Sequence, residues 1–594
     1  MIRAWSWKIK TATIKIYLLL ASKDRWDRYS SWAKKRENQL SEEPSGRYHA
    51  SSGNPIVTIF LPTSEQLKEQ AFQTLTSISH QTLPDWEIVL VEKVPDTFPL
   101  GQFSFDARIR SIKEPANSVP RVYLQDQIEK CKSDYLVLIS PGTTLSPTWL
   151  ASIAGILQSD PSAEVVYTDE DYRDPEDHAR SVPWFKPDWS PELLFSIDFL
   201  NGAVCSREAL IKTLGASRPD TSYQEAFLRM AFASRNVHHI SEVFIHRTGR
   251  GSRGLERTLL SNPAGSSNAF NLIPDHGKIS EGLAKQFIHP EASVDRSKDG
   301  EIHISAPKSD NLVSILIPTH DNAPVLERCV KSIFSNTSHG SYEIILLENN
   351  SKNAQTFKLY QNLQKDQRIR IISCDGPFNY NRVNNLGAKA ARGSLLLFLN
   401  NDVECIQSEW LDELVLWARQ PEIGGVSGKL LHPDRSIQHA GVIIGMEGHG
   451  SHVFGNMPEH SRGPFGSVDW YRDYSALTGA CLMVRRQPFE SINGFDEDYE
   501  LVFSDIDLCV RLSQAGYRNV YNPYAVLIHH EGKTRSNAIP EGDIRYGYQQ
   551  LKDFIRKGDP YYNRNLSLSI RVPALAYPWE EQPLQRLEKI VEYL

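Results

Sequence analysis

The chain has no hydrophobic run long enough to cross a membrane. Its longest apolar stretch, residues 16–21, falls far short of the roughly 20 residues that a spanning helix needs. The same brevity argues against a secretory signal. Cysteines at paired spacings are also missing, so we expect reduced thiols in the core of a cytoplasmic protein. The seven cysteines are Cys131, Cys205, Cys329, Cys374, Cys405, Cys481 and Cys509.

An excess of positive charge is missing as well. The net charge is −7 and the isoelectric point is about 6.2, which predicts no nucleic-acid partner. Residues 1–36 are the exception, with ten Lys or Arg against two Asp, a local charge of +8 that leaves −15 on the remainder. Aromatic residues interleave with that charge: Trp5, Trp7, Trp26, Tyr29 and Trp32. This composition fits an arm peripheral to the inner face of the membrane, or a basic tail that is disordered or packed on a domain.

Two kinds of catalytic motif are absent. No Ser/His/Asp or Cys/His constellation suggests a covalent nucleophile. No Gly-rich phosphate loop with a following Arg or Lys comes after the first strand, which argues against a nucleotidyltransferase. The length of 594 residues is sufficient for two large domains with extensions.

The sequence does contain a buried strand that runs directly into metal-ligand residues. Residues 395–399 form an apolar run typical of a central strand, and Asn400, Asn401, Asp402 and Glu404 follow it. Ligands bind at the carboxyl ends of strands in open α/β sheets. In an extended segment residues 400, 402 and 404 project to one side, where two carboxylates and an amide can face a Mg²⁺ or Mn²⁺ ion. A polar strand end that merely begins a loop is the alternative.

Strands and helices alternate around this stretch. Strands are expected at 312–319, 343–348 and 395–399, and helices at 324–335 and 378–393, the second ending at Gly393 as its C-cap. The alternation predicts a parallel, doubly wound sheet. Its strand ends carry Asp321, Glu348 and Asp402, which together can hold a base, a ribose and a metal-bound diphosphate.

Three downstream segments complete the motif order: TGACLMVRR (478–486), GFDEDYELVFSDIDLCVRL (494–512) and AVLIHHEGKTRS (525–536). With the strand ends above, they resemble a family 2 glycosyltransferase with a GT-A fold, an inverting enzyme that uses a nucleoside-diphosphate sugar. Asn400, Asn401 and Asp402 stand at this family's metal motif, with Asn at the first acidic position. The order also resembles a bacterial subgroup that builds surface polysaccharides, often with two such modules in tandem.

The resemblance implies roles for individual residues. Asp505 would be the general base that takes the proton of the acceptor hydroxyl; a helix-capping Asp is the alternative. Asn400, Asp402 and His529 would hold Mn²⁺ or Mg²⁺, with His530 as the rival of His529 because neighbours on a strand point opposite ways. The donor would contact Pro318, Thr319, Asp321, Glu348, Asn350, Asn385, Asn401 and Arg535.

Other polar residues near these motifs have looser assignments. Asp507 and Arg511, one helical turn apart, are expected to form a structural ion pair. Lys533 and Arg535 resemble the family's phosphate-contacting segment, or are solvated surface charges. Three histidines cluster within residues 429–458: His439, His449 and His452. They lack the spacing of a closed zinc site and have no Cys nearby, so we expect the acceptor-side loop here.

The first half of the chain repeats the pattern at low resolution. Strands echoing the second half lie at 55–63, 86–93 and 134–140, with a helix at 71–82. The metal position reads Ser140-Pro141-Gly142-Thr143, and Gln224 with Glu225 stand where the base is expected. Hydroxyls and a glycine cannot replace a charged ligand for a hard cation. We therefore expect a degenerate module that serves as a scaffold or binds acceptor. Asp169, Glu170 and Asp171 are expected in an acidic surface turn, with a displaced active site as the alternative.

The expected organisation is a basic aromatic arm (1–50), a degenerate GT-A-like module (51–250), a connector (251–311), a catalytic module (312–545) and a C-terminal extension (546–594). The connector is expected to contain a helix and a hairpin with its turn at Lys298-Asp299-Gly300. The predicted function is transfer of a hexose to a hydroxyl of a growing cell-surface glycan, free or lipid-linked. The alternative is a non-catalytic sugar-nucleotide-binding scaffold of a polysaccharide assembly complex.

Overall fold

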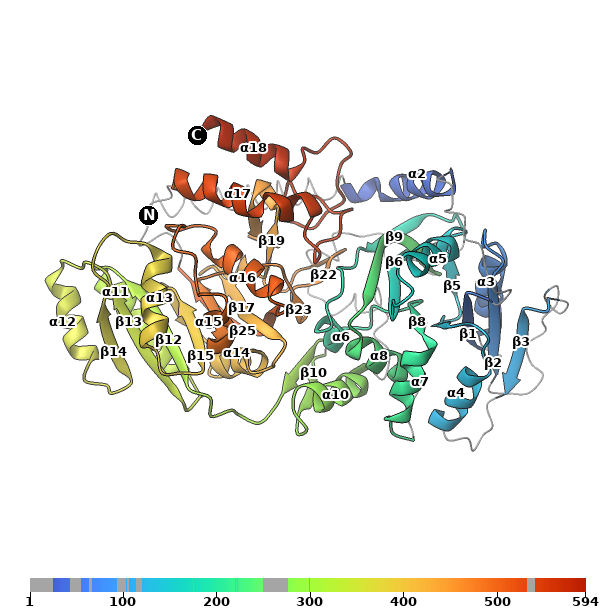
Figure 1. Ribbon diagram of the computed structural model, residues 1–594, viewed down its shortest axis with the longest axis horizontal. Coiled ribbons are helices and arrows are strands. Elements are labelled where there is room, and N and C mark those ends of the chain that lie inside the picture. The colour runs from blue at the N-terminus through green and yellow to red at the C-terminus, as the bar shows by residue number, and fades with distance from the viewer. Residues whose placement is uncertain are drawn as a thin grey trace. The chain divides into compact units, whose positions relative to one another are not determined.

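The computed structural model describes residues 25–42, 55–63, 67–92, 103, 106–113, 120–174, 176–219, 221, 223–248, 276–298, 300–530 and 540–594. The chain divides into two compact units, which fall mainly in residues 24–255 and 280–594. Each unit contains one large mixed sheet with helices around it, and α10 (His276–Phe287) lies between the two sheets in the sequence (Figure 1). Two α/β modules are therefore present, as the sequence repeat predicts.

The first module is built on a sheet of nine strands. Its elements are α2 (Tyr29–Glu42), β1 (Val57–Thr63), α3 (Lys68–Ser79), β2 (Trp86–Glu92), β3 (Ile109–Lys113), α4 (Pro120–Glu129), β4 (Tyr135–Leu138), β5 (Thr143–Leu145), α5 (Trp149–Ser159), β6 (Val165–Arg173), β7 (Arg180–Trp184), α6 (Leu193–Ser196), β8 (Val204–Ser206), α7 (Arg207–Gly215), α8 (Tyr223–Ala233) and β9 (Val237–Thr248). The strand order is β3-β2-β1-β4-β8-β6-β9-β5, with β7 beside β6. The first four strands of this path are parallel, whereas β8 is antiparallel to both neighbours.

The second module is built on a sheet of ten strands. Its elements are β12 (Val313–Thr319), α11 (Ala323–Ser335), β13 (Tyr342–Glu348), α12 (Ala354–Leu363), β14 (Ile369–Ser373), α13 (Tyr380–Ala390), β15 (Leu395–Leu399), β16 (Val403–Cys405), α14 (Trp410–Ala418), β17 (Ile423–Leu431), β18 (Ile437–His439), β19 (Val442–Ile444), η4 (Met446–Gly448), β20 (Gly450–His452), β21 (Arg462–Gly463), β22 (Gly466–Ser467), β23 (Arg472–Asp473), β24 (Cys481–Arg485), α15 (Arg486–Ser491), α16 (Ser504–Gln514) and β25 (Arg518–His529). The order is β14-β13-β12-β15-β24-β17-β25-β16.

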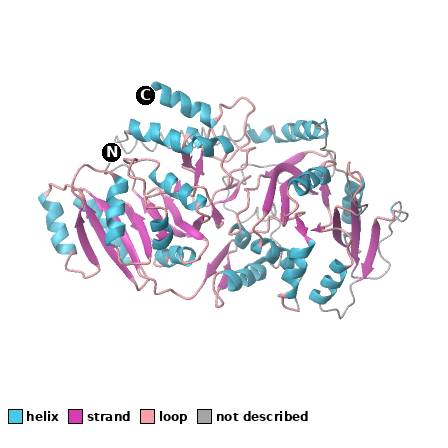
Figure 2. Ribbon diagram, in the orientation of Figure 1, coloured by secondary structure: helices cyan, strands magenta, loops and turns pink. Residues whose placement is uncertain are grey.

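The two sheets follow the same path strand for strand; Figure 2 shows the strands of both in magenta. In both, four parallel strands are followed by an antiparallel strand, then a parallel pair, then a short antiparallel edge strand. The central strand β15 is buried along its whole length, as its continuous apolar run predicts for a strand covered on both faces. Each such side chain contributes about 1.5–3 kcal/mol when fully buried.

Helix α13 ends earlier than the sequence suggests. It spans Tyr380–Ala390, and Ala391 already has extended dihedral angles, with φ −66° and ψ 150°. Gly393 is therefore not the C-cap. A Cβ atom on Gly393 would lie 2.4 Å from Leu312 O and 2.8 Å from Ser314 N, so glycine here allows the chain to pass close to β12.

The connector contains the expected hairpin. β10 (Ser293–Arg296) pairs antiparallel with β11 (Ile302–Ser305). Gly300 N donates to Ser297 O at 3.0 Å and closes the turn; Asp299 lies outside the described residues. The connector's helix is α10, whose described part begins at His276.

The C-terminal extension begins earlier than residue 546. α17 (Glu541–Lys557) is one continuous helix, so the boundary expected between residues 545 and 546 falls inside it. α18 (Pro583–Tyr593), which contains the amphipathic stretch seen in the sequence, packs on α17 and on η4 (Figure 1).

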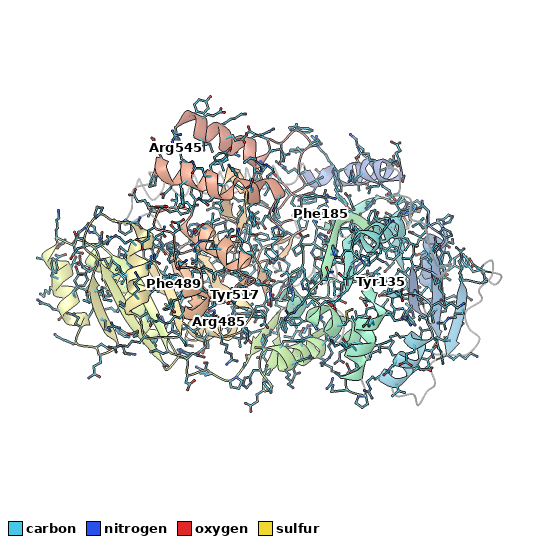
Figure 3. The ribbon with its side chains drawn as sticks, in the orientation of Figure 1. Tyr135, Phe185, Arg485, Phe489, Tyr517 and Arg545 are labelled. Atoms are coloured by element: carbon cyan, nitrogen blue, oxygen red, sulfur yellow. The ribbon has the colours of Figure 1, made fainter. Side chains whose placement is uncertain are left out.

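Part of the basic aromatic arm packs on the first module. The ring of Phe185, labelled in Figure 3, lies 6.3 Å from Trp26, 6.2 Å from Tyr29 and 5.9 Å from Trp32. Arg36 Nε donates to Glu242 Oε2 at 3.0 Å. The rings of Trp26 and Tyr29 are buried, which agrees with the alternative of a tail packed on a domain; membrane contact through residues 1–36 stays a prediction. Trp5 and Trp7 lie outside the described residues.

Two expectations from composition can be compared with the structure. All seven cysteines are free and buried, as expected for core thiols. None of the described helices is both long enough and apolar enough for a membrane span.

Candidate active site

Strand β15 ends in a turn and does not extend to Glu404. Asn400 follows the strand, Asn401 and Asp402 form the turn, and β16 begins at Val403. Val403 N donates to Asn400 O at 3.3 Å and closes this turn. The expectation that residues 400, 402 and 404 project to one side is therefore wrong, because that alternation holds only in a continuously extended segment.

The pairing of β16 with the end of β25 brings two histidines to two carboxylates. His529 Nε2 lies 3.1 Å from Asp402 Oδ1, and both side chains are buried. His530 Nε2 lies 2.7 Å from Glu404 Oε2, in a more exposed pair. Burial acts to raise the pKa of Asp402, but the hydrogen bond and charge of His529 outweigh it, so this pKa lies below its usual value. The two neighbouring histidines thus face different carboxylates.

The Asp402–His529 pair fits a divalent cation. The 3.1 Å between Asp402 Oδ1 and His529 Nε2 matches the roughly 3 Å between adjacent ligands that each lie about 2.1 Å from an ion. His529 Nδ1 is buried without a hydrogen-bond partner among the described residues. Within the same residues no group of three or more His, Cys, Asp or Glu can hold a metal. The pair therefore needs further oxygen ligands, such as Asn400 and a diphosphate.

Asp505 lies in the first turn of α16 and faces the backbone that leads into β24. Its Oδ2 accepts a hydrogen bond from Gly479 N at 2.8 Å, and its Oδ1 accepts from Ile506 N at 3.0 Å. Ala480, next to Gly479, accepts from Asn400 N at 3.0 Å. A short backbone link therefore joins the Asp505 carboxylate to the turn that carries Asp402.

Tyr380 places its hydroxyl at Gly479, the residue that also binds the Asp505 carboxylate. It donates to Gly479 O at 3.0 Å. Burial, and then the charge of Asp505, raise the pKa of Tyr380, so the hydroxyl stays protonated. Sequence reasoning missed Tyr380 and Gly479, because one is an ordinary helix residue and the other acts through its backbone.

Asp507 and Arg511 form the expected ion pair, with 2.8 Å between Asp507 Oδ2 and Arg511 Nε. The first module has its own version on α8, where Arg229 Nε lies 2.9 Å from Glu225 Oε1. Glu225 thus has the role of a structural partner. The repeat therefore extends to this helix, although the base-bearing residue itself is not repeated.

Asp321 follows β12 in a left-handed conformation, with φ 46°. Its Oδ1 accepts hydrogen bonds from Lys352 N at 3.0 Å and Asn353 N at 2.8 Å. These bonds, with that of Asn353 the largest contribution, lower the pKa of Asp321. The carboxylate therefore joins the end of β12 to the start of α12.

Glu348 and Asn350 follow β13 in a tight turn. Glu348 Oε1 accepts from Ser351 N at 2.5 Å. Asn350 has φ 56° and donates to Gly376 O, in the loop after β14, at 2.6 Å. Pro318 and Thr319 end β12 in parallel register with the last residues of β13. Five of the predicted donor-binding residues, counting Asp321, thus lie at one edge of the sheet.

Asn385 is placed differently from these five. Its side-chain nitrogen donates to Phe495 O and to Glu497 Oε1, both at 2.9 Å, and its oxygen accepts from Phe495 N at 3.0 Å. The side chain joins α13 to the segment before α16, which is a structural contact. Its contact with a donor stays a prediction. Arg535, like Lys533, lies outside the described residues.

The histidine cluster divides into a pair and a separate residue. His439 is buried and His452 is half-buried, with 2.9 Å between their Nδ1 atoms. Burial lowers the pKa of both, that of His452 to about 3, so both rings are neutral. His449 instead packs on Phe503, with ring centroids 5.3 Å apart.

The first module has different residues at the positions equivalent to Asp402 and His529. In the second module His529 is paired across strands with the residue after Asp402. In the first module Arg247 is paired in the same way with the residue after Gly142. The Arg247 guanidinium makes two hydrogen bonds of 3.1 Å to Glu170. A cation fixed to the chain therefore stands at the position of a metal ligand, and no carboxylate stands at the position of Asp402.

Asp169, Glu170 and Asp171 are not a surface turn. They lie on β6 and are at most 3% exposed. Their partners at 2.6–3.1 Å are His239 for Asp169, Arg247 for Glu170, and His246, Arg180 and Tyr29 for Asp171. Buried carboxylates persist only when paired in this way, so the expectation of a solvated turn is wrong.

The protein contains two GT-A-like α/β modules. The second keeps acidic and histidine side chains at its strand ends, and this combination defines the class of the protein. Residues 314–492 match the family model described as Glycosyl transferase family 2. The second module therefore belongs to family 2 of the glycosyltransferases.

Relatives extend over most of the chain. O-antigen biosynthesis protein RfbC of Myxococcus xanthus is 34% identical over 554 residues, which cover 91% of this chain and 42% of that protein. The uncharacterized protein y4gI of Sinorhizobium fredii is 30% identical over 563 residues, or 90% of this chain and 60% of that protein. The chain thus spans about half the length of these relatives. Mannosyltransferase PcManGT from Pyrobaculum calidifontis, solved with GDP-Man and Mn²⁺, has 15% identity and a TM-score of 0.33, covering 53% of this chain and 82% of that one.

Proposed function

We propose that the protein is an inverting, metal-dependent glycosyltransferase that moves a hexose from a nucleoside-diphosphate sugar to a hydroxyl of a growing cell-surface glycan. The observation that supports this most is the corner built around the turn after β15. The Asp402–His529 pair lies on one side of it, and the Asp505 carboxylate is linked to it through Gly479 and Ala480. A single displacement needs this arrangement, with the leaving diphosphate and the incoming hydroxyl at one sugar carbon.

Asp505 is the residue we assign to the acceptor. It takes the proton of the acceptor hydroxyl as that oxygen forms a bond to the anomeric carbon, while the bond from that carbon to the diphosphate oxygen breaks on the opposite face. The hydrogen bonds from Gly479 N and Ile506 N hold the carboxylate in one orientation. Transfer through one displacement inverts the configuration.

Asp402, His529 and Asn400 are the residues we assign to Mn²⁺ or Mg²⁺, which when bound would neutralise charge on the leaving diphosphate. The imidazole ligand favours manganese. Nucleotides bind in open α/β sheets at the carboxyl ends of the strands, and the donor contacts are assigned to that edge. They are Pro318, Thr319, Asp321, Glu348, Asn350 and Asn401, with Asn385 and Arg535 as further predicted contacts.

The acceptor is proposed to be a glycan or lipid-linked glycan of the O-antigen, capsule or exopolysaccharide type. The identity of 34% to the O-antigen biosynthesis protein RfbC supports this class of product. The first module, with the Arg247–Glu170 pair at its corner, is assigned to scaffolding or acceptor binding. Residues 1–36 are the segment we assign to peripheral contact with the inner face of the membrane.

The test is release of nucleoside diphosphate from a panel of sugar nucleotides, with and without manganese and with methyl glycosides as acceptors. Wild type should turn over one donor only when metal is present. Asp402→Ala should lose metal-dependent donor binding and turnover. Asp505→Asn should keep donor binding but lose about 10²–10⁴-fold in turnover, the usual contribution of a general base.

Glu404→Gln is the matched control, because Glu404 lies two residues from Asp402 but contacts His530. It should retain turnover close to that of wild type. Metal-dependent donor binding by wild type without turnover, unchanged in Asp505→Asn, would support the sugar-nucleotide-binding scaffold instead. Absence of donor binding under all conditions would refute both assignments.

A further inference from the structure

A buried carboxylate on the C-terminal helix α17 holds the segment that leads to Asp505. Asp543 is 1% exposed. Its Oδ1 accepts from Glu500 N at 2.7 Å, and its Oδ2 accepts from Leu501 N and Val502 N, both at 2.8 Å. Hydrogen bonds from backbone N–H to a charged carboxylate are about twice as strong as neutral ones. Three of them on one side chain fix the path of this segment.

The carbonyl groups of the same segment are held from the start of α13. Tyr380 N donates to Glu500 O at 2.9 Å. The side-chain nitrogens of Asn381 and Asn379 donate to Tyr499 O at 2.9 Å and 3.0 Å. The segment therefore has its carbonyls bound by α13 and its amides bound by α17.

Two further residues on the same face of α17 contact this region. Tyr546 OH donates to Asp496 Oδ2 at 2.8 Å. A Cβ atom on Gly547 would lie 3.0 Å from the ring of Phe503, so the ring packs on the helix backbone. Asp543, Tyr546 and Gly547 have the i, i+3, i+4 spacing of one helix face. Phe503 has φ 66°, a strained conformation that persists only where the surroundings fix it.

We propose that Asp543 is a positioning residue for Asp505, and that α17 supports the active site by binding the backbone segment that leads to Asp505. This inference rests on the proposed function, in which Asp505 takes the acceptor proton. Phe503 follows residues 499–502, whose carbonyls and amides are bound by α13 and by Asp543. The first turn of α16, which carries Asp505, begins directly after Phe503. The orientation of the Asp505 carboxylate thus depends on the contacts that Asp543 makes. A displacement of about 1 Å at a reacting group costs on the order of 10²-fold in rate.

The test compares Asp543→Asn with Glu541→Gln. Glu541 also lies in the first turn of α17 and is exposed, so the control removes the same charge from the same helix end without touching the segment. The donor is the sugar nucleotide that wild type turns over fastest with manganese and a methyl glycoside acceptor. Asp543→Asn should lower kcat by about 30–100-fold, with donor Kd unchanged within about twofold. Glu541→Gln should match wild type in both.

A purely structural role is separated by a double substitution. If Asp543 acts through Asp505, then Asp543→Asn added to Asp505→Asn should cause little further loss, because the group being positioned is already gone. Hydrogen exchange gives a readout that does not need activity. The amides of residues 500–502 should exchange faster in Asp543→Asn and at the wild-type rate in Glu541→Gln.

The results of these experiments separate failure of this inference from failure of the proposed function on which it rests. Wild type without any metal-dependent turnover refutes the proposed function and the inference with it. An active wild type with Asp543→Asn equal to Glu541→Gln, or with fully additive losses in the double variant, overturns the inference alone. If Asp543→Asn unfolds at the assay temperature, Tyr546→Phe takes its place. It removes only the hydroxyl contact to Asp496, and it should lower kcat several-fold at unchanged donor Kd; an unchanged kcat overturns the inference.

Discussion

Asp171 is the residue of the first module whose loss should be most costly for stability. Its buried carboxylate accepts from Tyr29 OH at 2.7 Å and Arg180 Nε at 2.6 Å, and lies 2.7 Å from His246 Nδ1. Asp171→Ala leaves the Arg180 guanidinium, only 7% exposed, with the half-exposed Glu37 as its remaining carboxylate partner. Breaking a buried ion pair in this way costs about 3–5 kcal/mol.

Two further variants separate the parts of that cost. Tyr29→Phe removes one hydrogen bond to a charged group and should cost about 1.5–3 kcal/mol. Replacing both members of the ion pair, as Asp171→Leu with Arg180→Met, should recover most of the loss, because no unpaired charge then remains buried.

The assay is urea unfolding, combined with hydrogen exchange of peptides from β6 and β9. Exchange should rise in both strands of the Asp171→Ala variant. Donor turnover by the second module should change little below the unfolding transition, if the modules unfold independently. A loss of less than about 1 kcal/mol, the worth of an ordinary surface pair, would refute the claim that this network stabilises the first module.

Three other outcomes can be measured on the same preparations. Burial acts to lower the pKa of His339, but its hydrogen bonds to Asp412 and Asn311 O raise that pKa above 6.5. The stabilisation from the charged form of His339 is therefore complete below about pH 6.5 and is lost as the pH rises through the raised pKa. In the His339→Gln variant, Tm should fall less between about pH 6 and pH 8 than in wild type. An unchanged dependence of Tm on pH would contradict this. Gly393→Ala should destabilise by about 1–3 kcal/mol, because its Cβ would meet Leu312 O at 2.4 Å. Gly155 lies inside α5 with nothing within 4 Å of its Cβ position, so Gly155→Ala should stabilise by about 0.5–1 kcal/mol. Thermal melts measure both, and equal effects would refute the packing argument. The seven buried thiols should react with a thiol reagent only as fast as the protein opens, so rapid native labelling of any of them would count against the burial described here.

The sequence predicts the parts of the fold that depend on local pattern. The run Leu395–Leu399 is a buried strand because a strand covered on both faces needs continuous apolar residues. The repeat follows for the same reason, since both halves carry apolar runs in the same order. The meeting of Asp402 with His529 is also anticipated, although from family motif order and not from any local pattern.

What the sequence does not predict depends on partners distant in the chain. Asp169, Glu170 and Asp171 look like a solvated turn because three consecutive acids usually are one. Their bases on β9 lie 70, 77 and 75 residues away, and no local pattern connects them. Asp543 is hidden for a similar reason: an Asp in the first turn of a helix suggests only a favourable charge at the helix start. Its contacts appear when the strand order brings α17 to the segment before α16.

The Arg247–Glu170 pair places a cation that belongs to the chain itself at the position that a metal ligand takes in the second module. An ion held at the corner of the second module would exchange with solvent, so its occupancy would follow the supply of metal in the cell. A guanidinium stays charged and cannot dissociate from its own chain. If the proposed metal site is correct, the protein has one module whose state depends on a bound ion and one whose cation is part of the chain. Metal starvation would then stop the chemistry of the second module and leave the structure of the first module intact.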